Sequence, residues 1–116
     1  MIKVKILGAE LEADLLNPDI CRIYEENGIK VAKQSEESLK CKRTSDAIRM
    51  QCNAVMECLD ATFGNGSAKK VLGGSTDLLR CLDAYADYCD IIEKYVEPLL
   101  KEKVAEARAR AALKER

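Results

Sequence analysis

The chain has 116 residues, of which 47% are hydrophobic and 34% are charged, so it is long enough for one folded domain with its own core. It contains no histidine, which excludes Ser-His and Cys-His nucleophile pairs and every histidine metal ligand. The net charge is −1 and only 4% of the residues are aromatic, so we expect no binding of nucleic acid.

The charge is unevenly distributed along the chain. Residues 1–98 hold 13 basic and 17 acidic side chains, net −4, whereas residues 99–116 hold 6 basic and 3 acidic ones, net +3. We therefore predict a domain over residues 1–98 and a basic, Ala-rich extension over residues 99–116 that is helical or flexible. No stretch is apolar enough to span a membrane and no signal peptide is recognisable, so we expect a cytoplasmic protein with no membrane partner.

The chain contains six cysteines, whose chemical state has to be interpreted. The six are Cys21, Cys41, Cys52, Cys58, Cys81 and Cys89. None forms a Cys-x-x-Cys pair, and no histidine is present to complete a mixed zinc site. Several fall on predicted apolar helix faces, where reduced cysteine behaves as a small hydrophobic residue. Reduced, metal-free thiols are the favoured interpretation, with a disulfide or a metal site as the alternatives.

The N-terminal segment predicts a β-hairpin over about residues 2–15. Apolar side chains alternate there with lysines and then with acidic residues, which is the period of half-buried strands. We expect the turn at Gly8-Ala9 and the lysines of one strand opposite the acids of the other. Because a two-stranded ribbon is marginal by itself, it must pack on helices or pair through its free edge, which is a candidate self-association site.

The first helix is predicted to begin at Asn17-Pro18-Asp19. Asparagine is a good cap, proline fits the first helical position, and aspartate favours the N-terminal end of the helix dipole. Its second half, residues 33–43, is mostly polar. We expect that half to remain helical but to project from the domain or fray.

A second helix is predicted from Thr44 to about Phe63, with an apolar side chain at every third or fourth position from Ile48. The glycines of Gly64-Asn65-Gly66 can end it, and a short helical turn, capped by Ser67, connects it to the next helix. The segment from Gly64 to Lys70 has the wrong spacing for a phosphate-binding loop and follows a helix instead of a strand. It is interpreted as a connector.

The last long helix is predicted to begin at Ser75 or Thr76 with Asp77, and we expect Pro98 to break or kink it. Its apolar positions alternate at intervals of four and three over three heptads, which favours packing within the domain or on a partner helix. These positions are Leu78, Leu82, Tyr85, Cys89, Ile92, Val96 and Leu99. The expected common core is Ile48, Cys52, Val55, Leu59, Leu78, Leu82, Tyr85 and Cys89.

The fold class predicted from these elements is α+β, mainly α: an N-terminal hairpin followed by about three longer helices and a short connector helix. The acidic pairs Asp83/Asp87 and Asp87/Asp90 are interpreted as a solvated face. No catalytic, cofactor-binding or metal-binding residue is predicted, so we expect a binding protein and no enzyme.

The predicted partner-binding surface lies on the last helix. Its residues are Tyr88, Ile92, Tyr95 and Val96. Tyrosine is enriched at interface hot spots, and Tyr88 and Tyr95 stand seven residues apart beside the apolar positions. Ordinary half-buried packing of these side chains is the alternative.

Several segments, in order, resemble short proteins encoded in the tail-gene clusters of phages and prophages of Gram-positive bacteria. The resemblance covers roughly residues 1–97. It is carried by the Ile2-to-Asp14 hairpin with Gly8 and Glu10-Leu11-Glu12, Tyr24-Glu25, Ile48-Arg49, Gln51-Cys52-Asn53, Phe63-Gly64-Asn65-Gly66, Ala68-Lys69-Lys70-Val71-Leu72-Gly73, Cys81-Leu82 and Ala84-Tyr85. The Phe-Gly-x-Gly…Lys-Lys-x-x-Gly segment is the most specific part.

This resemblance implies a tail assembly chaperone-like adaptor. Such a protein binds the tape-measure protein and keeps its long hydrophobic helices soluble during tail morphogenesis, with no enzyme activity, metal or cofactor. Wrapping a long client also requires weak self-association, for which the hairpin edge is the candidate site. The chain departs from the family pattern in its Ala/Arg-rich C-terminal end. The alternatives are a structural tail or head-tail connector component that stays in the virion, a small regulatory protein, and a redox or metal protein that uses the cysteines.

Overall fold

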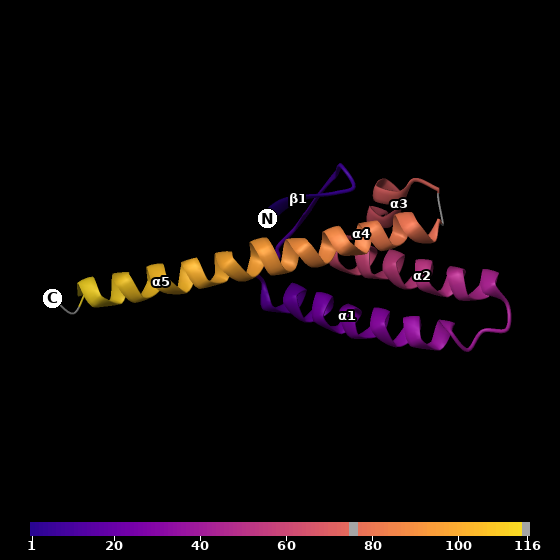
Figure 1. Cartoon of the computed structure of the whole chain (residues 1–116). Coiled ribbons are helices and arrows are strands. Elements are labelled where there is room, and N and C mark those ends of the chain that lie inside the picture. The colour runs from indigo at the N-terminus through magenta and orange to yellow at the C-terminus, as the bar shows by residue number, and fades with distance from the viewer. Residues whose placement is uncertain (75–76, 115–116) are drawn as a thin grey trace.

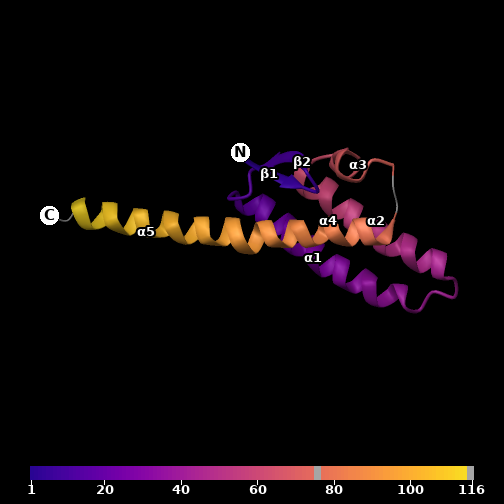
Figure 2. The same ribbon diagram turned by 45° about the horizontal axis from the view of Figure 1, so that its top comes forward.

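A computed structural model describes residues 1–74 and 77–114 (Figures 1 and 2). The elements are β1 (Ile2–Ile6), β2 (Ala9–Ala13), α1 (Pro18–Ser38), α2 (Thr44–Phe63), α3 (Ser67–Leu72), α4 (Leu78–Ile91), the π-helical segment η1 (Ile92–Val96) and α5 (Glu97–Lys114). The predicted class, α+β and mainly α with an N-terminal hairpin, is confirmed. The predicted helix start at Ser75 or Thr76 lies outside the described residues.

The hairpin places lysines of β1 opposite acidic residues of β2, as predicted, although its register is shifted by two residues from the one that a Gly8-Ala9 turn implies. Lys3 pairs with Glu12 and Lys5 pairs with Glu10 across the antiparallel strands, and these side chains are exposed. The alternate side chains point inward, and that of Ile6 is fully buried. The ribbon is therefore stabilised by packing on the helices, because two strands are marginal in isolation.

The hairpin turn differs from the prediction by one residue. Ile6 pairs with Ala9, so the turn is Leu7-Gly8 and not Gly8-Ala9. Both turn residues have positive φ, 49° and 82°, as a type I′ turn requires. A leucine is disfavoured there, and its N–H donates to Oδ2 of Asp87 on α4 at 3.0 Å. This bond fixes the turn to α4, and it gives Asp87 a structural contact where a purely solvated carboxylate was expected.

Helix α1 begins at Pro18 as predicted but ends at Ser38, so residues 39–43, which were expected to remain helical, lie outside it. The side chain of Asn17 caps it by accepting a backbone N–H bond at 2.9 Å. The second half does not project, because it packs along α2. Ser38 is buried and its hydroxyl accepts a bond from Gln51 of α2 at 2.9 Å, while Lys30 forms an exposed 3.0 Å ion pair with Glu57.

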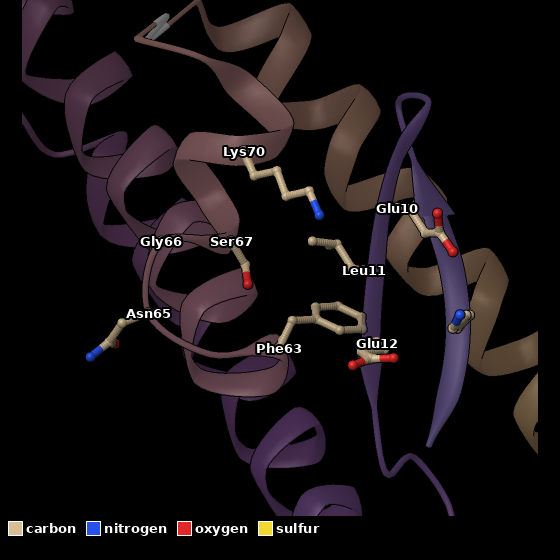
Figure 3. A pocket seen from close by; sticks show the side chains of 9 residues that line it. Glu10, Leu11, Glu12, Phe63, Asn65, Gly66, Ser67 and Lys70 are labelled. Atoms are coloured by element: carbon tan, nitrogen blue, oxygen red, sulfur yellow. The ribbon is translucent and has the colours of Figure 1, made fainter.

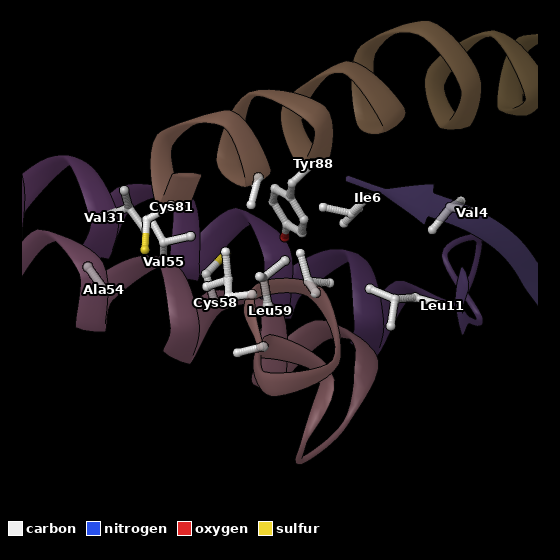
Figure 4. Packing of buried hydrophobic residues seen from close by; sticks show 14 of the residues in the cluster. Val4, Ile6, Leu11, Val31, Ala54, Val55, Cys58, Leu59, Cys81 and Tyr88 are labelled. Atoms are coloured by element: carbon white, nitrogen blue, oxygen red, sulfur yellow. The ribbon is translucent and has the colours of Figure 1, made fainter. Parts of the chain in front are cut away.

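The core lies where α2 meets α1, α4, α3 and the hairpin (Figure 4). Its most completely buried side chains are Ile6, Leu15, Leu59, Val55, Cys52, Cys58, Cys81 and Ser38. Three of these are cysteines, and Ala54 and Ala84 are also buried. Small side chains at these positions let the helix backbones approach closely.

The buried face of α4 is rotated from the predicted one. Leu82 is 42% exposed, so its predicted place in the core is wrong. The buried residues of α4 are Cys81, Ala84 and Tyr88. Of the other predicted core residues, Cys52, Val55 and Leu59 are buried, whereas Ile48, Leu78, Tyr85 and Cys89 are half-buried. At 100° per residue, the centre of the observed face is turned by roughly 100° from that of the predicted one.

Pro98 does not break the last helix. Proline lacks an N–H, and its ring crowds the carbonyl four residues earlier. The helix widens just before it, over η1, where the N–H of Glu97 bonds to the carbonyl of Ile92, five residues back. Helices α4 and α5 therefore form one long rod, and α5 extends away from the rest of the chain (Figure 1). The overall extents are 68 × 27 × 20 Å.

No helix within the described residues is long and apolar enough to cross a lipid bilayer.

Candidate interaction surfaces

The four predicted partner-binding residues do not form one surface. Tyr88 and Val96 are each only 3% exposed and belong to the core. Ile92 is half-buried, and Tyr95 is 51% exposed. In this conformation Tyr95 is the member of the set that is open to a partner, and Tyr88 and Val96 serve the packing of the domain.

Tyr88 joins α4 to the C-terminal end of α2. Its hydroxyl lies 3.0 Å from Oγ1 of Thr62 within a buried hydrogen bond. Its ring stacks on Tyr85 with centroids 5.9 Å apart, and meets the ring of Phe63 edge-on at 6.1 Å. Burial raises the pKa of Tyr88 far above its usual value, and the nearby Cys58 thiol adds to the increase. The sequence analysis did not predict this cluster. Its one sign in the sequence is Thr62, a polar residue on the apolar face of α2.

A hollow of about 530 Å³ lies between the hairpin and the α2–α3 connector (Figure 3). Lys70 and Leu11 point toward one another across it, and Phe63 lies below them. Its lining residues are Lys3, Glu10, Leu11, Glu12, Phe63, Asn65, Gly66, Ser67 and Lys70. Two lysines and two glutamates balance one another there, so the charge of the hollow favours neither anions nor cations.

The connector between α2 and α3 is a turn that is stabilised by contacts of residues within and next to it. Gly64 and Gly66 have φ of 106° and 92°, which only glycine adopts without strain. The carboxylate of Asp60 accepts the N–H of Ala68 at 2.9 Å, so one of the free amides at the start of α3 is already occupied. Gly66, and not Ser67, is the residue that caps α3. The segment from Gly64 to Lys70 is a connector, as its spacing indicated.

Three thiols are made less reactive by their surroundings. Burial raises the pKa of Cys81 to about 12 and also raises the pKa of Cys58 and Cys89. Because the thiolate is the nucleophile and the metal ligand, these side chains are poor at both tasks near neutral pH. In residues 1–74 and 77–114, no three His, Cys, Asp or Glu side chains lie close enough together to hold a metal ion.

An apolar groove of about 390 Å³ lies where the start of α1 meets the η1–α5 junction. Leu16 and Tyr24 line one side, and Val96 and Leu100 line the other. Leu16 is 39% exposed and Leu100 is 55% exposed, so both present apolar surface to solvent. An apolar surface of this kind favours contact with another apolar side chain.

Helix α5 continues from this groove without any cover. Every side chain from Lys101 to Leu113 is exposed. Val104 is 46% exposed and Leu113 is 68% exposed. The predicted helical extension is therefore a helix over its described part, about 27 Å long at 1.5 Å per residue.

Neither the curated proteins nor the solved structures contain a match to this chain. The sequence profile of one family of unknown function, DUF6673, matches residues 7–114, which includes the hairpin turn, all of the helices and the whole of the described C-terminal rod. The family description assigns no activity. Because the match covers nearly the full length, the chain belongs to the DUF6673 family.

Proposed function

We propose that this protein is a non-enzymatic adaptor of the tail assembly chaperone type, which binds the tape-measure protein of a phage tail in the cytoplasm of the host bacterium. It would keep the long helices of that client soluble until the tail tube forms around them. It would then leave, so the finished virion would not contain it.

The observation that carries this proposal is the uncovered rod α5. Most helical stability in proteins comes from packing of an apolar face, and isolated helices of this length are marginal in water. Yet α5 has apolar side chains, Leu100 and Val104 among them, with about half of their surface exposed. A helix held in this way on a folded body suits a protein that shares its apolar side chains with a helical client.

The phage context rests on the resemblance of the sequence segments, of which Phe63-Gly64-Asn65-Gly66 with Lys69-Lys70 is the most specific. In the structure this segment has a role in packing. It forms the connector that orients α3 against α2 and the hairpin. The phage context and the client both remain part of the proposal.

Co-expression tests the proposal directly. The proposal expects a gene for a very long helical protein, the candidate tape-measure protein, beside this one. That protein is expressed with and without the chain, and its soluble fraction is measured. We expect the soluble fraction to rise several-fold with the chain and the two proteins to co-purify. Equal solubility in both cases would contradict the adaptor function.

The alternative is a structural tail or connector component. Mass spectrometry of purified virions separates the two, because an assembly chaperone is absent from the finished particle. Stoichiometric recovery of this chain from purified tails would replace the chaperone with the structural component.

A further inference from the structure

The exposed rod has a narrow apolar face. Leu100, Val104, Ala107 and Ala111 follow one another at intervals of four, three and four residues. At 100° per residue they fall within about 60° of one another around the α5 axis. All four are exposed. We call this set the α5 seam, and its spacing is that of the a and d positions of a coiled coil.

Basic side chains border the seam on both sides. Lys101 and Arg108 occupy the positions along one border, and Lys103 and Arg110 occupy those along the other. All four are exposed. These are the e and g positions, which in a coiled coil lie opposite the corresponding positions of the partner and decide which partner is accepted.

Between Leu100 and Ala111 the acidic side chains lie away from the seam, whereas Glu97, three residues before Leu100, lies in line with it at the edge of the groove. Glu102 and Glu106 fall on the opposite half of the helix, between about 130° and 180° from the seam centre. Glu106 reaches only Lys103, through a 3.4 Å ion pair in which both side chains are about half exposed. An exposed pair of this kind contributes little, so the borders keep their positive charge.

This charge pattern selects the occupant of the seam. Two copies of α5 packed along their seams would face basic borders with basic borders in either orientation, and like charges opposite one another are destabilising. A partner helix with glutamate or aspartate beside its own apolar positions would pair at both borders. Nucleic acid is a poorer fit, since the apolar residues run between the basic rows and residues 1–98 carry a net charge of −4.

We propose that the α5 seam docks an amphipathic helix of a partner protein whose own apolar stripe is bordered by acidic residues. This deepens the proposed adaptor function and rests on it, by naming the chemistry of the client segment. Leu100 belongs both to the seam and to the apolar groove beside Leu16 and Tyr24. A docked helix that runs along α5 toward the body therefore reaches this groove, where Leu16 and Tyr24 offer apolar contact and where Arg22, Glu25 and Glu97 also line the surface.

Designed peptides test this with the full-length protein and need no native client. One labelled peptide of about four heptads has leucine at a and d and glutamate at e and g, and a second has lysine in place of those glutamates. Fluorescence anisotropy at low and high salt measures their binding. We expect the glutamate peptide to bind, more weakly at high salt, and the lysine peptide to bind at least about tenfold more weakly. A third peptide that keeps the glutamates but has serine at a and d should also fail, because the seam contact is then lost.

A charge-reversed pair of variants gives the decisive comparison. Arg108→Glu/Arg110→Glu reverses one residue of each border, and Lys69→Glu/Lys70→Glu changes the net charge by the same amount on α3. We expect the first variant to lose about tenfold in affinity for the glutamate peptide and to gain affinity for the lysine peptide, while the second stays within about twofold of wild type. Circular dichroism of both variants must match wild type.

The outcomes are separable from those of the adaptor test. Equal effects of the two variants, or binding of the serine peptide as tight as that of the leucine peptide, would overturn the seam proposal. So would binding of a DNA duplex in place of the glutamate peptide, or a stable dimer lost on Arg108→Glu/Arg110→Glu. If wild type and Arg108→Glu/Arg110→Glu solubilise the client equally, the adaptor function is supported and the proposal that the α5 seam docks the client is refuted.

Discussion

Removing the Tyr88 hydroxyl tests the buried link between α2 and α4. In Tyr88→Phe the ring keeps its contacts with Phe63 and Tyr85, so the main change is the loss of the 3.0 Å bond to Thr62 Oγ1. A buried polar group that loses its partner costs about 1–3 kcal/mol. We expect the free energy of unfolding to fall by this amount, and the melting temperature by roughly 4–8 °C per kcal/mol.

The control is Tyr95→Phe, because Tyr95 is 51% exposed. That variant should lie within about 0.5 kcal/mol of wild type. Urea unfolding followed by far-ultraviolet circular dichroism measures both variants at pH 7, where tyrosine is neutral. Thr62→Val and the double variant complete the cycle, and the double variant should cost less than the sum of the single ones by about 1 kcal/mol or more. Equal stabilities of Tyr88→Phe and Tyr95→Phe, or simple additivity in the cycle, would refute the buried bond.

Three further predictions follow from the core and its thiols. Leu59→Ala should lower the free energy of unfolding by about 2–5 kcal/mol, whereas Leu82→Ala, at an exposed site, should lower it by less than about 1 kcal/mol; similar losses in urea unfolding would place Leu82 in the core after all. In the folded protein the pKa of Cys81 and of Tyr85 is raised to about 12, above the values in the unfolded chain. The unfolded chain therefore loses these protons first, so the free energy of unfolding should be constant below pH 9 and fall as the pH rises toward 12. Cys81→Ala should make that decline shallower, and an unchanged pH profile would count against it. All six cysteines should titrate as free thiols in denaturant without reductant, and zinc analysis of the native protein should find none; a missing pair of thiols would indicate a disulfide.

The local signals of the sequence identified most of the elements. The alternation over residues 2–15 predicted the two strands and their inward faces, because inward and outward positions of a half-buried strand must differ in polarity. It did not fix the register, which depends on the turn. Asn17 begins α1 and Gly64 ends α2 for reasons contained in a few neighbouring residues. The turn was misplaced by one residue since Leu7 adopts positive φ, and the Asp87 carboxylate that accepts its N–H lies 80 residues further along.

The orientation of α4 could not be found in the same way. Its sequence holds two overlapping apolar faces, one with the larger Leu78 and Leu82 and one with the smaller Cys81 and Ala84. Size favours the first face for burial, but close packing against α2 requires small side chains on the second. Only the partner helix decides between them. The same decision moved Tyr88 from the predicted surface into the core, where Thr62 supplies the partner for its hydroxyl.

Pro98 shows why the C-terminal end was also uncertain from sequence. Its missing N–H and crowded ring are compatible with a break, a kink or a widened turn, and these differ in what they require of the preceding residues. Val96, two residues earlier, is buried against the body, so the chain must keep a helical path up to that position. A π-helical turn, in which an N–H bonds to the carbonyl five residues earlier, satisfies both requirements. The Glu97 N–H bonds to the Ile92 carbonyl and the helix axis continues. The rod that results places Leu100 at the edge of the groove and the rest of the α5 seam beyond the body, where a second protein can reach both of its basic borders.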